Sequence, residues 1–253
     1  MNMFSSRFSW RSYEYVFRPE VEPGDVFLQR VAPALPSPYV EWVARWTEAL
    51  AACHRDGGQV EPLRMGPRAK EKRIARREKK AKMKIPAPLR AFFLNMAEYV
   101  SFSWENPGWT LDVNGYQIKG PAGHLHIRLK DVIPVTRLDG WNPAMWSRAV
   151  VDALGEDAEE VRAFLENAIA FMAVGNGDQL VIDARDGKVK YLSHDDPEIM
   201  GVVLGQDFDS FMDAWSSLGC IGPEIWHLQP FLGANGLTKR LLDVFQTASI
   251  YRE

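Results

Sequence analysis

The stretch AVGNGDQLVIDARDGKVKYLSHDD, residues 173–196, decides how this chain folds. Two partly apolar runs, DQLVID and KVKYLS, flank the tetrapeptide ARDG. This pattern predicts a β-hairpin in which Gly187 supplies the positive φ of the turn. Asp, Gly and His residues crowd the ends of the hairpin: Gly175, Gly177, Asp178, Asp183, His194, Asp195 and Asp196. These side chains either perform chemistry, as acids, bases or metal ligands, or they shape turns and strand ends.

Helical periodicity flanks the hairpin on both sides. Apolar residues at helical spacing predict helices over residues 38–56, 86–96, 206–219 and 236–249. The segment GEDAEEVRAFLENAIAFMAVG, residues 155–175, carries the same spacing from Val161 to Met172. We therefore expect a helix there as well, with Gly175 as its C-terminal cap.

Four short segments bounded by Gly, Pro or Asn resemble strands, namely GWTLDV, YQIKG, GHLHIRL and DVIPVTRL. Helices come first along the chain, then antiparallel strands, then helices again. This order favours an α+β fold, an antiparallel sheet packed against helices with extra helices at the N-terminal end, over alternating βαβ units.

Composition and charge narrow the class of protein. The chain has 253 residues, a formal net charge of −3 and two cysteines far apart in sequence. No secretory signal or membrane-spanning run is visible, so we expect a soluble, cytoplasmic protein without a disulfide framework. Residues 1–84 hold 17 Lys and Arg against 10 Asp and Glu, whereas residues 85–253 hold 13 against 23. This asymmetry suggests two electrostatic surfaces.

The basic segment 64–84 contains 11 Lys and Arg and two Glu, in a composition that favours helix. We expect an ordered helix that lies against acidic surface of the same molecule. A solvated helix or linker is one alternative. A nucleic-acid patch is another, but no aromatic residue is interleaved to stack on bases, so we do not expect nucleic acid as a partner.

No motif in the sequence marks a catalytic centre. GNGD at 175–178 lacks the Gly-Lys-Ser/Thr of a phosphate-binding loop, and neither a GxSxG elbow nor a catalytic cysteine context is present. His124 and His126 share one face of a predicted strand, and His194 could complete a metal site, which makes a metal-dependent hydrolase an alternative. The residues favour a non-catalytic binding protein without metal or cofactor.

Three segments in order carry a resemblance to a known family. IPAPLRAFFLNMAEYVSFSW (85–104), the hairpin stretch and LGQDFDSFMDAWSSLGC (204–220) resemble a SUKH-superfamily domain of the Smi/Knr type. The resemblance covers residues 80–222, leaving 1–79 as an N-terminal extension and 223–253 as a C-terminal helical extension. It implies an α+β domain with no catalytic residues, in which Gly175, Gly177, Asp178, Asp183, Gly187 and His194 are structural.

The resemblance also implies a function. Most bacterial members are immunity proteins that bind and neutralise a polymorphic toxin, so we expect a protein partner with a basic surface. Five acidic residues are the candidate contacts: Asp195, Asp196, Glu198, Asp207 and Asp209. An intracellular adaptor of the same fold is the alternative, and the sequence is compatible with a monomer or a homodimer that does not bind membranes.

Overall fold

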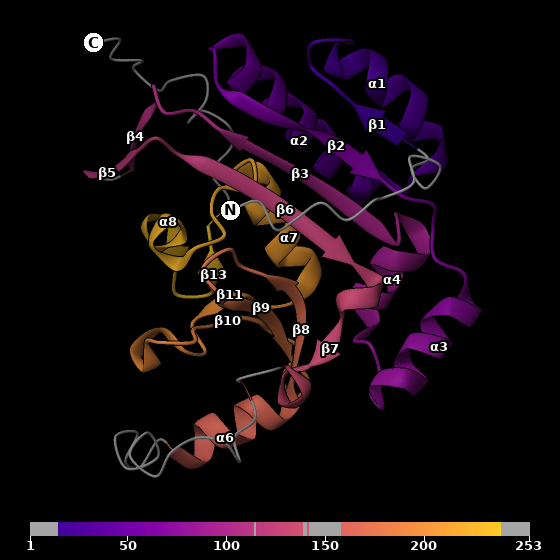
Figure 1. Ribbon diagram of the computed structural model, residues 1–253, viewed down its shortest axis with the longest axis vertical. Helices are drawn as coiled ribbons and strands as arrows, with labels where there is room; N and C mark the ends of the chain where they lie inside the picture. Colours follow the sequence, from indigo (N-terminus) through magenta and orange to yellow (C-terminus); the bar gives the residue numbers. More distant parts are fainter. Residues whose placement is uncertain (1–14, 114, 139–140, 142–157, 239–253) are drawn as a thin grey trace, which may run out of the picture.

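A computed structural model describes residues 15–113, 115–138, 141 and 158–238 of this chain. Within these residues the protein is α+β, which confirms the expected class: helices pack against antiparallel sheets (Figure 1). None of the described helices is long and apolar enough to cross a membrane.

The first sheet has four antiparallel strands in the order β1-β2-β3-β6. They are β1 (Tyr15–Phe17), β2 (Gln59–Met65), β3 (Tyr99–Glu105) and β6 (Ala122–Arg128). In β6 the buried Leu125 and Ile127 alternate with the half-buried His124 and His126, so the two faces of the strand differ. Helix α2 (Ser37–Arg55), predicted from the sequence, packs on the buried face.

The second sheet has five strands in the order β11-β10-β9-β8-β7. They are β7 (Ile133–Pro134), β8 (Ala168–Ala173), β9 (Gln179–Asp183), β10 (Val189–Leu192) and β11 (Val203–Gly205). Strands β9 and β10 form the predicted hairpin, with Gln179 opposite Leu192 and Gly187 at a φ of 77°. This sheet is the scaffold of the acidic residues at 178–198.

The predicted helix over 155–175 is wrong in its second half. Residues 142–157 lie outside the described residues, α6 spans Ala158–Asn167, and the chain then enters strand β8. The first five residues of β8 are buried on both faces of the sheet, so the strand lacks the alternation that identifies a half-exposed strand. A continuous apolar run of this kind cannot be told from a buried helix by its periodicity.

Helix α7 (Phe208–Ser217) and the residues directly after it contact β8 of the second sheet, β3 of the first sheet and the helices α2 and α4 (Ala87–Asn95). Phe208 contacts Phe92 of α4 and Phe171 of β8, with ring centroids 5.5 Å apart in both pairs. The indole of Trp46 donates to Ser216 Oγ at 2.9 Å, and that of Trp104 donates to the Gly219 carbonyl at 2.7 Å. Besides α3 (Glu71–Ala81) and several short 3-10 helices, the other described elements are α1 (Gly24–Val31), α8 (Ile225–Leu228), β4 (Thr110–Val113), β5 (Tyr116–Lys119), β12 (Leu232–Gly233) and β13 (Gly236–Leu237).

One hydrophobic core crosses the segment limits drawn from the sequence. It contains Phe17 and Trp46 from the N-terminal extension, Phe102 and Trp215 from the middle segment, and Phe231 beyond residue 222. The helix predicted over 236–249 begins instead with strand β13, and its residues after 238 lie outside the described part.

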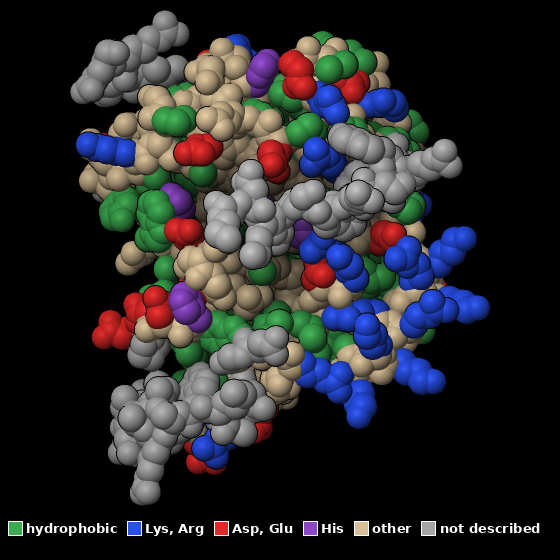
Figure 2. Space-filling model, viewed as in Figure 1, with side chains coloured by type: hydrophobic (Ala, Val, Ile, Leu, Met, Phe, Trp, Pro, Cys, Tyr) green, Lys and Arg blue, Asp and Glu red, His purple; other side chains and the backbone are tan. Residues whose placement is uncertain are grey.

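The basic segment 64–84 contains the expected ordered helix but, in the part of the chain that the structure describes, not the expected acidic surroundings. Arg64 belongs to strand β2, and helix α3 occupies Glu71–Ala81. Ile74, Glu78 and Ala81 are its buried residues, so the helix is docked on the body. The expected acidic neighbour is largely absent in the described residues: Arg73 pairs with Glu98 at 2.7 Å, but the helix's other exposed cations have no such partner. Figure 2 shows Lys and Arg gathered where Figure 1 places α3.

Candidate functional site

The turn between β8 and β9 holds the first group of hairpin residues. The Val174 amide donates to the Asp178 carbonyl at 2.9 Å, and Gly177 has a φ of 105°, a backbone conformation that favours glycine. Gly175 lies in this turn and is not the helix cap that the sequence suggested, because β8 replaces the end of the predicted helix.

Asp178 is the buried centre of a hydrogen-bonded cluster. One carboxylate oxygen accepts from the backbone amide of His194 at 2.8 Å and faces His194 Nδ1 at 2.7 Å. The other accepts from Asn176 Nδ2 at 2.6 Å and from the hydroxyl of Tyr191. Each carboxylate oxygen thus has two polar contacts, and Asp178 links the end of β10 to the start of β9.

The titration of this cluster follows from its contacts. Burial alone would raise the pKa of Asp178, but the hydrogen bonds from Tyr191 and His194 outweigh it and leave the pKa below its ordinary value. The same carboxylate raises the pKa of His194 through the hydrogen bond to its ring. Burial, together with Asp178, raises the pKa of Tyr191. Asp178 is therefore an ionised structural acceptor at neutral pH.

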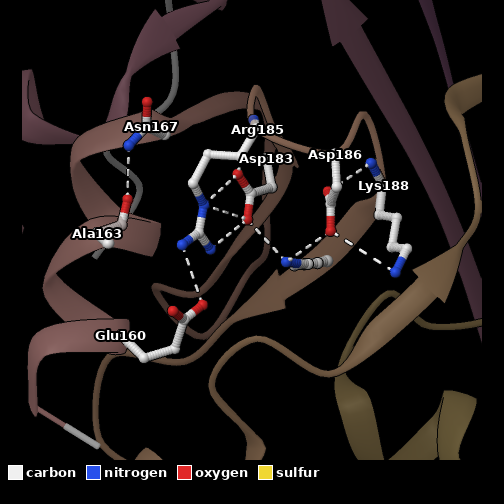
Figure 3. Close-up of polar contacts among 8 residues, drawn as sticks. Glu160, Ala163, Asn167, Asp183, Arg185, Asp186 and Lys188 are labelled. Atoms are coloured by element: carbon white, nitrogen blue, oxygen red, sulfur yellow. Dashed lines mark hydrogen bonds and ion pairs between the residues drawn. The ribbon is translucent and has the colours of Figure 1, made fainter.

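Asp183 organises the other end of β9, which Figure 3 shows in close-up. Its fully buried carboxylate accepts from Arg185 Nη2 and from Lys190 Nζ, both at 2.7 Å. Arg185 also pairs with Glu160 of α6 at 3.0 Å, which ties the helix to the hairpin. Burial tends to raise the pKa of Asp183, but the hydrogen bonds from Arg185 and Lys190 prevail and lower it to about 2.

The predicted contact residues fall into two groups. Asp195, Asp196 and Glu198 are exposed on the loop after β10, which we call the acidic turn (residues 194–198). Its backbone is fixed locally, because the Asp196 amide donates to Ser193 Oγ at 3.1 Å and the Glu198 amide donates to Asp196 Oδ1 at 2.9 Å.

Asp207 and Asp209 belong to the start of α7. Asp207 is the N-cap, and its carboxylate accepts from the Ser210 amide at 2.7 Å in a capping box. Burial raises the pKa of Asp209, and Asp207 adds to the effect. The capping role of Asp207 is a structural use of a side chain that the sequence suggested as a partner contact.

The three histidines of the hydrolase alternative do not form one cluster. Within the described residues, the group of potential metal ligands that converge is Asp178, His194 and Asp195, without His124 or His126. The rings of His124 and His126 stack on β6, with centroids 6.1 Å apart. Burial lowers the pKa of both, that of His126 to about 4 with the help of Arg128, so both are neutral at physiological pH.

The converging group is also a poor metal centre. Each Asp178 oxygen already takes part in two polar contacts, and an ion would have to displace them. Asp195 Oδ1 accepts from Ser193 Oγ, which leaves His194 Nε2 and Asp195 Oδ2, 3.8 Å apart, as the ligands still free in this group. A catalytic zinc ion takes three protein ligands. The arrangement is suited to holding a loop in shape and presenting carboxylates to solvent.

Four residues of these clusters were not identified from the sequence: Asn176, Tyr191, Arg185 and Lys190. The signal for Arg185 and Lys190 was available, because a strand-end Asp beside two cations predicts a paired carboxylate. Tyr191 gave no signal, since a tyrosine in a strand is ordinarily a packing residue.

Comparison with known proteins adds no assignment. No protein-family model matches this chain, and no curated protein matches it.

Proposed function

We propose that this protein is a non-catalytic protein-binding module that uses the acidic turn to engage a basic partner surface. The observation that carries the proposal is the turn's preformed geometry. Asp195, Asp196 and Glu198 are exposed, while the backbone between them is fixed by Ser193 and by the buried Asp178.

Two physical effects favour such a surface. A loop that is already ordered loses less conformational entropy on binding than a mobile one. A cluster of carboxylates accelerates association with a basic partner and disfavours acidic ones. Within the described residues, Asp195 faces the ring of His194, whereas Asp196 and Glu198 are in no ion pair, so the charge of these two carboxylates is available to a partner.

The partner class follows from the sequence resemblance. A SUKH-type immunity protein binds a toxin domain, and a toxin that acts on nucleic acid needs a basic cleft that a carboxylate cluster can cover. The same surface suits an adaptor with a housekeeping partner, which is the runner-up.

The test begins with a tagged full-length chain used to capture partners from its native host. The captured protein is then produced alone, and its affinity is measured by calorimetry with wild-type chain and with a variant carrying Asp195→Asn, Asp196→Asn and Glu198→Gln. We expect the variant to weaken binding at least tenfold, mainly through slower association, and to make binding less dependent on salt.

A matched control removes three exposed carboxylates elsewhere, with Glu20→Gln, Asp25→Asn and Glu48→Gln. It should bind as the wild type does. A toxin domain among the captured proteins supports the immunity function, and a housekeeping protein supports the adaptor. Equal losses in both variants would show that net charge, and not the acidic turn, governs the interaction.

A further inference from the structure

Helix α3 presents a face made almost entirely of cations. Lys72, Arg76, Lys79 and Lys80 are exposed and lie on the side opposite the buried Ile74. At 3.6 residues per turn these four side chains form one continuous stripe, which we call the α3 stripe. Within the described part of the chain, none of the four is in an ion pair.

The acidic residues of the helix are used internally and do not interrupt the stripe. Glu78 is buried, accepts from the Ile85 amide at 3.1 Å and pairs with Lys84 at 3.3 Å. Glu71 forms a bidentate pair with Arg90 of α4. Both carboxylates therefore anchor α3 to the segment that follows it, and the outer face keeps its full positive charge.

The arginines beneath the stripe add charge to it. Arg77 Nε donates to the Val132 carbonyl at 2.7 Å, and Arg137 Nη1 donates to the Lys80 carbonyl at 3.0 Å. These contacts dock the helix through neutral carbonyl oxygens. A guanidinium bound to a carbonyl keeps its positive charge, so Arg77 and Arg137 add positive charge beside the stripe, and Asp131 near Arg77 offsets part of it.

Against the expectation drawn from the sequence, we propose that the α3 stripe binds the phosphate backbone of double-stranded nucleic acid without sequence preference. The surface chemistry separates this partner from an acidic protein. Protein interfaces have an apolar centre and are depleted in lysine, whereas nucleic-acid interfaces are more polar and far more positive. Three of the four stripe residues are lysines, and Ala75 is the exposed apolar residue of the helix.

The same side chains indicate the form of nucleic acid. The helix has no aromatic residue on which unpaired bases could stack, so its chemistry favours a duplex over a single strand. It also lacks the Asn and Gln that read adenine edges, and its charges are suited to phosphate contacts.

The experiment titrates the full chain against a short, fluorescently labelled DNA duplex of random sequence and follows anisotropy at several salt concentrations. We expect micromolar affinity at low salt and a slope of log K against log salt of about −3 to −4, since each phosphate contact contributes about −0.9. The variant Lys72→Ala, Arg76→Ala, Lys79→Ala, Lys80→Ala should bind at least tenfold more weakly with a shallower slope. Alanine preserves the helix, which circular dichroism will check.

The control variant removes four exposed cations elsewhere, with Arg30→Ala, Arg55→Ala, Lys119→Ala and Arg162→Ala. It should retain wild-type affinity. Three results would overturn the proposal: no duplex binding by the wild type at low salt, equal losses in the two variants, or binding of poly-glutamate as tight as that of the duplex. The last result would assign the stripe to an acidic polypeptide.

Discussion

Two buried carboxylates, Asp178 and Asp183, lie at opposite ends of β9. The sequence alone left open whether they are catalytic or structural. Asp178 and Asp183 are both almost inaccessible, yet both have a pKa below the ordinary value because donors surround them. A catalytic acid or base that works near neutral pH needs its pKa moved toward 7, the opposite direction. The electrostatics of the hairpin therefore favour a structural role.

Replacing Asp183 by Ala should destabilise the fold by about 2 to 4 kcal/mol, because it leaves Lys190 and Arg185 without their buried acceptor. Glu160→Ala is the matched control, since Glu160 binds the same Arg185 from an exposed position. Its cost should stay below about 1 kcal/mol. Urea unfolding at neutral pH measures both, and similar costs would contradict the central role of Asp183.

The stability that Asp183 contributes should depend on pH in a defined window. Its pKa is about 2 in the folded state and near 4 in an unfolded chain, so the unfolded state binds the proton first as pH falls. The contribution is complete above pH 4 and disappears as pH falls through 2. Accordingly, Asp183→Asn should cost less at pH 3 than at pH 7 in urea unfolding experiments. A cost independent of pH would contradict this assignment.

His194 should titrate above the ordinary histidine value, because its ring is hydrogen-bonded to Asp178. The stabilisation from this contact is present below pH 6.5 and lost as pH rises through the raised pKa. In NMR titrations Asp178→Asn should lower the midpoint of His194. Asp195→Asn, which removes a carboxylate 3.8 Å from the other ring nitrogen, should lower it less. The reverse order would show that Asp195 controls the ring.

Among the described glycines, Gly123 of β6 leaves the least room for a side chain. A Cβ on Gly123 would lie 2.1 Å from Trp104 Nε1, the atom that donates to the Gly219 carbonyl. Gly123→Ala should therefore cost about 3 kcal/mol, through overpacking and a lost hydrogen bond. Gly175→Ala is the control, because nothing lies within 4 Å of its Cβ position and it should change stability by less than about 1 kcal/mol. Thermal unfolding of the two variants gives the comparison, and a Gly123→Ala variant as stable as wild type would contradict the packing argument.

Elements with one buried face were predictable from the sequence, and elements with two were not. Helices α2 and α4 and the first half of α7 each bury one stripe of apolar residues, which gives the 3.6-residue period. Strand β8 is buried on both sides, so its sequence showed no period of two. The pairing of β2 with β3 was also beyond the sequence, because no local pattern links strands separated by two helices.

The candidate site was also predictable only in part: the hairpin register followed from the sequence, and the side-chain contacts did not. Once the hairpin is placed, Gln179 lies opposite Leu192, and Asp178 therefore comes near residues 193 and 194. The hydrogen bond from Tyr191 to Asp178 depends on side-chain packing in the finished sheet. The unpaired charge of the α3 stripe depends on the burial of Glu78 and on the pairing of the exposed Glu71 with Arg90, which composition does not show.

At the scale of the whole molecule, the two charged surfaces are separated. Figure 1 places the loop after β10 and helix α3 on opposite sides of the view, with the sheets between them. The basic residues of the N-terminal part and the acidic residues of the C-terminal part thus form two separate surfaces, the α3 stripe and the acidic turn. Charges separated by more than about 8 Å at physiological salt are largely screened, so the two surfaces can bind different partners independently.

The folding unit extends to the N-terminal side of residue 80. Residues 15–79 supply β1, β2 and α2, and α2 alone buries Trp42, Val43, Trp46 and Leu50. Burial of four such side chains stabilises by about 6 to 12 kcal/mol, comparable with the whole stability of a typical domain, about 5 to 15 kcal/mol. Deletion also exposes the edge of β3 that pairs with β2. A fragment of residues 80–253 should therefore lose cooperative urea unfolding, as followed by tryptophan fluorescence, while the full chain unfolds in one transition. A sigmoidal transition in the fragment would show instead that the segment from residue 80 folds as an autonomous domain.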